Sequence, residues 1–134
     1  MQTTVETFGG IEIHGSKDFI AEMKEALTLL QYSPSFQKAF PFLTSIDAAD
    51  ILGPNSDAEM HRYDGNKPAY NHSAISYGGD IAYLACRSML LQRKKRDTGK
   101  PNDIDNQCAE FRAKVEQELY RFSLNDYRQS FMHW

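Results

Sequence analysis

The fold is decided by the stretch Gly79-Asp80-Ile81-Ala82-Tyr83-Leu84-Ala85-Cys86-Arg87-Ser88-Met89-Leu90-Leu91-Gln92. Apolar side chains cover most of the circumference of a helix built from this stretch, which predicts that the helix lies in the centre of the fold. The polar exceptions Asp80, Tyr83 and Arg87 stand at i, i+3 and i+7, and residues at these spacings share one helix face. We therefore expect one polar stripe on this helix, directed into the core, and we expect function to lie there.

Length and composition indicate an ordinary globular protein. The chain has 134 residues, of which 41% are hydrophobic and 25% are charged. This length fits a single domain over residues 1–134 that buries a sizeable core. Apolar runs are too short to span a membrane, and residues 1–6 resemble no secretory signal. We expect a soluble protein without a membrane partner, cytoplasmic as synthesised, with export without a visible signal peptide left open.

The residues that most often bind metals are scattered. Cys86 and Cys108 fall on apolar faces of predicted helices without a metal-type spacing, which favours buried free thiols over a disulfide. The histidines lie in four different segments, at His14, His61, His72 and His133. A metal site from His61 and His72 across a hairpin is the alternative. We expect no metal site and no cofactor.

The net charge of −3 conceals a local basic run, Arg93-Lys94-Lys95-Arg96. As a functional feature, the run would be a phosphate- or nucleic-acid-binding patch, a nuclear-import-like signal or a cleavage site. As a structural feature, it places cations at the carboxyl end of the central helix, where they interact favourably with the helix dipole. We favour the structural interpretation and expect no nucleic-acid partner, because nucleic-acid binders spread basic charge over a face and this chain is acidic overall.

The amino-terminal half alternates strand and helix signals. Two β-prone segments, Thr3–Thr7 and Ile11–His14, surround Gly9-Gly10 and predict a hairpin or a pair of edge strands. Ser16 precedes apolar residues at helical spacing and predicts the start of a helix that ends near Gln31. Ser33-Pro34 repeats the start signal for a short helix, which Pro41 should interrupt.

Signals in the other segments are weaker until the last helices. We expect a strand near Ala49–Leu52 and a hairpin from Glu59–Tyr63 to Pro68–Asn71 around Asp64-Gly65-Asn66. Apolar residues then recur at helical spacing at Ile104, Cys108, Phe111, Val115 and Leu119. Ser123, with Asp126 three residues later, predicts a separate last helix. The predicted class is α+β, mainly helical, with a central buried helix and a small antiparallel β element.

Four short stretches carry a family resemblance. They are Gly10-Ile11-Glu12-Ile13-His14-Gly15-Ser16-Lys17-Asp18-Phe19, Ala26-Leu27-Thr28-Leu29-Leu30, Tyr83-Leu84-Ala85-Cys86-Arg87-Ser88-Met89-Leu90 and Ile104-Asp105-Asn106-Gln107-Cys108-Ala109-Glu110-Phe111. Together they resemble small effector- and toxin-type zinc metallopeptidases of the HExxH-like class. The resemblance implies a strand, a Gly-Ser turn and a helix ahead of a helix with two ligand histidines, then an acidic helix with the third ligand.

The chain departs from this family at the metal-ligand positions. Carried over by position, the ligand histidines become Tyr83 and Arg87, the general base becomes Leu84, and Asp105, or in second place Asp103, stands for the acidic ligand. Arginine has no lone pair to donate, and a lone phenol is a weak zinc ligand. Peptidase chemistry needs a metal-activated water and a base. The resemblance therefore implies a pseudo-metallopeptidase.

Two functions from different classes remain open. In the first, the chain is a non-catalytic interaction or scaffold protein, effector- or toxin-related, with an unidentified protein partner. Arg87 then pairs with Asp80, Asp105 or Glu110, and Tyr83 completes a buried polar network.

The alternative is an enzyme of another class, a hydrolase, with a site formed by His72, Asp80, Tyr83 and Arg87. His72 would act as acid or base, Asp80 would orient it, and Arg87 would bind an anionic group. The structural alternative is that Asn71-His72-Ser73 and Tyr77-Gly78-Gly79 only form the loop that enters the central helix.

Overall fold

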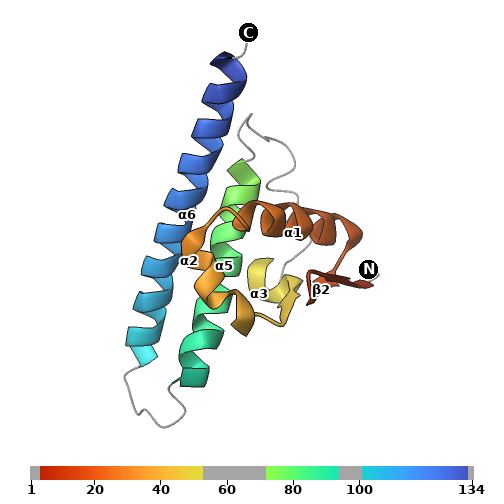
Figure 1. The fold of residues 1–134 in the computed structure, drawn as a ribbon. Helices are drawn as coiled ribbons and strands as arrows, with labels where there is room; N and C mark the ends of the chain where they lie inside the picture. Colours follow the sequence, from red (N-terminus) through yellow and green to blue (C-terminus); the bar gives the residue numbers. More distant parts are fainter. Residues whose placement is uncertain (1–3, 53–71, 94–100, 133–134) are drawn as a thin grey trace.

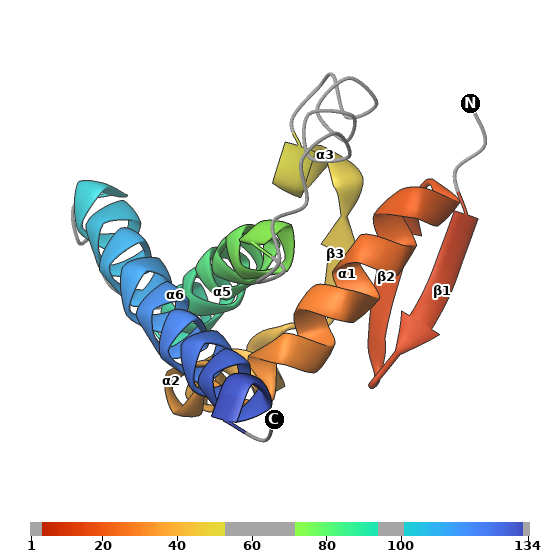
Figure 2. The same ribbon diagram turned by 90° about the horizontal axis from the view of Figure 1, so that it is seen from above.

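A computed structural model describes residues 4–52, 72–93 and 101–132. The fold is α+β and mainly helical, as predicted, with a small three-stranded sheet at one side (Figure 1). Two long helices, α5 (His72–Arg93) and α6 (Pro101–Met132), run side by side. Seen from above, α5 lies between α6 on one side and α1 (Lys17–Leu30) with the sheet on the other (Figure 2). The prediction of a central helix is confirmed.

The sheet begins with the predicted hairpin. Strands β1 (Thr4–Phe8) and β2 (Ile11–Gly15) pair antiparallel, and the turn between them places Gly9 at φ 59° and Gly10 at φ 83°. These left-handed conformations favour glycine. A third strand, β3 (Ser45–Asp47), pairs with β2 in parallel, which the sequence analysis did not predict. The sheet is therefore mixed rather than purely antiparallel.

Two serine caps form as predicted. The Ser16 hydroxyl accepts a hydrogen bond from the Phe19 amide at 3.1 Å at the start of α1. The Ser33 hydroxyl accepts one from the Phe36 amide at 3.1 Å at the start of α2 (Pro34–Ala39). Helix α2 then gives way to a 3-10 turn, Phe40–Phe42, because Pro41 lacks the amide that would continue the helix.

The segment predicted as a strand near Ala49–Leu52 is a helix instead. Helix α3 (Ala48–Leu52) follows β3 directly, and the Asp47 carboxylate accepts a hydrogen bond from the Ala49 amide at 2.9 Å. Aspartate caps of this kind satisfy an amide that the first helical turn leaves free. The hairpin predicted from Glu59–Tyr63 to Pro68–Asn71 lies outside the described residues.

The central helix begins earlier than predicted, at His72. Tyr77-Gly78-Gly79 therefore lie within α5 and not in a loop that precedes it. Packing against α6 explains these glycines. A Cβ atom on Gly78 would lie 2.9 Å from Leu119 Cδ1, and one on Gly79 would collide with the Glu116 carboxylate. The two glycines weaken helix propensity, but they let α6 approach α5 closely.

Helix α6 continues to Met132 without the predicted new start at Ser123. Next to Ser123, the rings of Phe122 and Tyr32 stack with their centroids 3.8 Å apart and 9° between their planes. Val115 and Leu119 are completely buried on the same helix. Contacts with α5 and with Tyr32, in the connection between α1 and α2, therefore extend the helix through a sequence that resembles a local start signal. Within the described ranges, no helix is long and apolar enough to cross a membrane.

Candidate functional site

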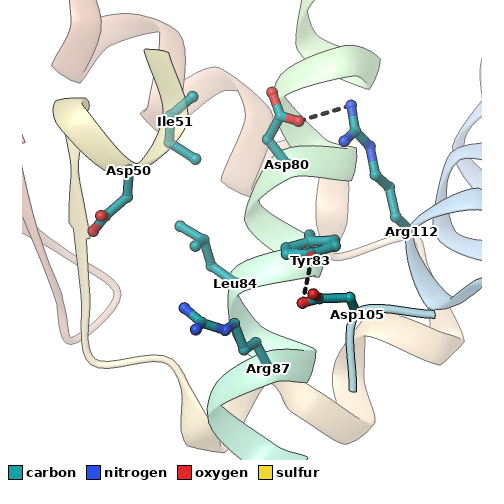
Figure 3. Close-up of a pocket in the computed structure, with 8 residues that line it drawn as sticks. All are labelled: Asp50, Ile51, Asp80, Tyr83, Leu84, Arg87, Asp105 and Arg112. Carbon is teal, nitrogen blue, oxygen red and sulfur yellow. Dashed lines mark hydrogen bonds and ion pairs between the residues drawn. The ribbon is translucent and has the colours of Figure 1, made fainter. Parts of the chain in front are cut away.

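The polar stripe of α5 lines a surface pocket of about 390 Å³ between α3, α5 and α6 (Figure 3). The pocket is lined by Asp50, Ile51, Asp80, Tyr83, Leu84, Arg87, Asp105 and Arg112. The prediction that Asp80, Tyr83 and Arg87 share one face is confirmed. Their predicted direction is wrong, because Asp80 and Tyr83 are half-buried and Arg87 is exposed. The stripe faces an open pocket, since α6 covers only one side of it.

On the α6 side, ion pairs join the two long helices. Asp80 Oδ1 lies 2.8 Å from Arg112 Nη2, and Arg112 Nε donates to Glu116 Oε1 at 3.0 Å. The sequence analysis did not identify Arg112 as a site residue. Its i, i+4 spacing to Glu116 is a local signal, but its contact with Asp80 depends on how α5 and α6 pack. Arg112 thus pairs with both Asp80, at the pocket edge, and Glu116.

Also on the α6 side, the Tyr83 hydroxyl donates a hydrogen bond to Asp105 Oδ1 at 3.1 Å (Figure 3). Desolvation by burial raises the pKa of the Tyr83 phenol, and the hydrogen bond and negative charge of Asp105 raise it further, although Arg87 opposes them. The phenol therefore stays protonated at neutral pH and acts as a donor. Tyr83 and Asp105, both among the predicted binding residues, line the same pocket.

The α3 side of the pocket differs. Leu84 and Arg87 extend from α5 toward α3, which contributes Asp50 and Ile51 (Figure 3). Within the described part of the chain, neither Arg87 nor Asp50 forms an ion pair or a side-chain hydrogen bond. The prediction that Arg87 pairs with Asp80, Asp105 or Glu110 is therefore wrong. Asp80 forms its ion pair with Arg112 of α6 instead.

The other predicted site residues are His72 and the basic run over residues 93–96. His72 is the first residue of α5, about 12 Å along the helix axis from Asp80, and its side chain is outside the described residues. Arg93 is exposed at the end of α5, with its guanidinium carbon 5.7 Å from the centroid of the Phe42 ring. The rest of the basic run, Lys94, Lys95 and Arg96, also lies outside the described residues.

The pocket does not fit zinc at the positions that the resemblance assigns. Arg87 has no lone pair, and Tyr83 uses its proton to donate to Asp105. Across the described ranges, no group of three or more His, Cys, Asp or Glu side chains is placed to hold a metal ion. We therefore assign no zinc-dependent step to this site.

The two cysteines join α5 to α6, with Cys86 on the first helix and Cys108 on the second. Both are buried free thiols, as predicted, and their side chains share a hydrogen bond. Desolvation raises the pKa of the Cys108 thiol to about 12, with further contributions from Cys86 and Asp105. A thiol with such a pKa is almost entirely protonated at neutral pH and is a poor nucleophile.

Comparisons of the chain with protein-family models, curated proteins and solved structures return no match. The metallopeptidase resemblance therefore stays a prediction that rests on short stretches of sequence.

Proposed function

We propose that this chain is a non-catalytic interaction protein that docks a partner at the pocket between α3, α5 and α6. The observation that carries the proposal is the exposed guanidinium of Arg87, which lines the pocket and has no ion-pair partner among the described residues. Charged hydrogen bonds from arginine are strong and directional. A partner that supplies a carboxylate to Arg87 would gain such bonds.

The other polar groups support binding rather than catalysis. Asp80 is neutralised by Arg112, and Tyr83 donates to Asp105 with a raised phenol pKa. A general base needs a free lone pair and a pKa near the working pH. The Tyr83 phenol has neither property in this arrangement. These pairs give the pocket a fixed polar wall, which suits recognition.

The hydrolase alternative has less support. It needs His72 to act together with Asp80, Tyr83 and Arg87, and the side chain of His72 lies outside the described residues. Asp80 would have to orient His72, but its carboxylate is held by Arg112 on the neighbouring helix. The effector or toxin context is a further part of the proposal that rests only on the sequence resemblance.

The docking proposal is tested by affinity capture from a lysate, quantified by mass spectrometry, with wild type, Arg87→Gln and Arg121→Gln as baits. Arg121 is a matched control, because it is an exposed arginine of α6 that does not line the pocket. We expect one set of proteins to be captured in equal amounts by wild type and Arg121→Gln. The captured amounts of these proteins should be at least tenfold lower with Arg87→Gln. Equal retention by all three baits contradicts docking at this pocket. Equal melting temperatures of the three proteins exclude misfolding as the cause.

A further inference from the structure

The pocket-lining residues that form no ion pair within the described part of the chain indicate which class of ligand the pocket binds. Its lining contains three aspartates and two arginines, which gives the pocket a formal net charge of −1. Arg112 pairs with Asp80, and Asp105 accepts a hydrogen bond from the Tyr83 hydroxyl. On the α3 side, Arg87 and Asp50 remain, a cation and an anion that have no ion-pair partner in the described part of the chain.

These two groups disfavour singly charged ligands. A simple anion would bind Arg87 but would meet an excess of carboxylates, and a simple cation would bind Asp50 but would be repelled by Arg87. A zwitterion satisfies both groups and adds no net charge to the pocket. Because charged groups that leave water must be paired to avoid a large desolvation cost, the pocket selects a ligand that carries both charges.

The remaining lining residues on this side are apolar. Ile51 of α3 and Leu84 of α5 are partly buried and lie on the same side as Asp50 and Arg87 (Figure 3). They offer an aliphatic surface for the ligand's carbon skeleton. The pocket volume of about 390 Å³ lies in the range of small-molecule sites, about 300–1,000 Å³.

We propose that the pocket binds a small aliphatic amino acid, whose carboxylate pairs with Arg87 and whose ammonium pairs with Asp50, while Ile51 and Leu84 contact its carbon chain. This inference rests on the proposed function only in taking this pocket as the binding site. It adds a small-molecule ligand that would compete with a protein partner for Arg87.

The test is a titration of the isotope-labelled protein followed by NMR, with L-leucine and 4-aminobutyrate as probes. Each probe is compared with forms that lack one charge: leucine amide and N-acetylleucine for the first, butyrate and butylamine for the second. We expect at least one zwitterion to give saturable shifts in α3 and α5 with a dissociation constant below about 10 mM. Both single-charge forms of that probe should bind at least tenfold more weakly.

Variants locate the binding. Arg87→Gln and Asp50→Asn should each weaken the zwitterion at least tenfold, and Arg121→Gln should leave it unchanged. The inference is overturned if neither zwitterion saturates, if single-charge forms bind equally well, or if both variants retain wild-type affinity. If partner capture depends on Arg87 while no zwitterion binds, the ligand assignment fails and the docking proposal stands. If a zwitterion binds while capture is independent of Arg87, the docking proposal fails alone.

Discussion

Replacing Glu118 with alanine should destabilise the fold, because its carboxylate joins α6 to the start of α2. One Glu118 oxygen accepts hydrogen bonds from the Ser33 hydroxyl at 2.7 Å and the Ser35 amide at 3.1 Å. The other oxygen accepts from the Ser35 hydroxyl at 2.5 Å. Both serines are buried, with 0% and 6% of their surface exposed. Alanine at position 118 would leave these donors without their acceptor.

The expected magnitude follows from these contacts. A hydrogen bond to a charged group contributes about 1.5–3 kcal/mol, and each buried polar group left unsatisfied costs about 1–3 kcal/mol. Water that enters the partly exposed site recovers part of this loss, so we expect Glu118→Ala to lower the free energy of unfolding by about 3 kcal/mol. For a domain of this size, the melting temperature should fall by about 10 °C.

Urea and thermal unfolding followed by circular dichroism measure this effect. The matched control is Glu110→Ala, which removes an exposed glutamate from the same helix; its effect should stay within about 0.5 kcal/mol. If Glu118→Ala is no more destabilising than Glu110→Ala, the hydrogen bonds to Ser33 and Ser35 do not hold α2 against α6.

The stability that the Glu118 carboxylate contributes should depend on pH. Desolvation acts to raise the pKa of Glu118, but the hydrogen bonds from Ser35 and Ser33 outweigh it and hold the pKa below its ordinary value of 4.5. A depressed pKa stabilises the fold above the unfolded-state pKa, and that stabilisation disappears as the pH falls through the folded-state pKa. The stability advantage of wild type over Glu118→Gln should therefore be constant near neutral pH and shrink below about pH 4.5.

Two further predictions concern packing and thiol chemistry. A Cβ atom on buried Gly15 would lie 2.6 Å from Phe19 Cδ2 and 3.2 Å from Ala48 Cβ, so Gly15→Ala should cost about 1–3 kcal/mol in urea unfolding; an unchanged midpoint contradicts this packing. Because burial raises the pKa of Cys108 from 9.0 to about 12, its thiolate fraction at pH 8 is about a thousandfold below that of a free cysteine. Ellman's reagent should therefore label Cys108 only after unfolding, and rapid labelling of the folded protein refutes the burial of this thiol.

Local signals in the sequence were sufficient for the amino-terminal elements. Gly9-Gly10 predicted the hairpin because both residues adopt positive φ, and Ser16 and Ser33 predicted two helix starts because each hydroxyl caps the amide three residues later. Each of these features depends on groups within a few residues of one another, so a sequence pattern contains the necessary information.

Features that depend on distant contacts were missed. The start of α5 at His72 requires α6 to pack against Gly78 and Gly79, and no local pattern reports that contact. The candidate site shows the same division. Helical spacing correctly placed Asp80, Tyr83 and Arg87 on one face, but Arg112 pairs with Asp80 only because α6 crosses that face. Arg87 was therefore expected to be paired and is instead exposed.

The contact between Glu118 and Ser33 also constrains the order of folding. The two residues are 85 positions apart, and Ser35 is 83 positions from the same carboxylate. During synthesis, the ribosome releases the amino-terminal segment long before residue 118 is added. The hairpin and α1 have local contacts that can form early, but the acceptor that fixes the start of α2 arrives with the last helix. A nascent chain should therefore reach its native stability late, in one cooperative step that requires α6.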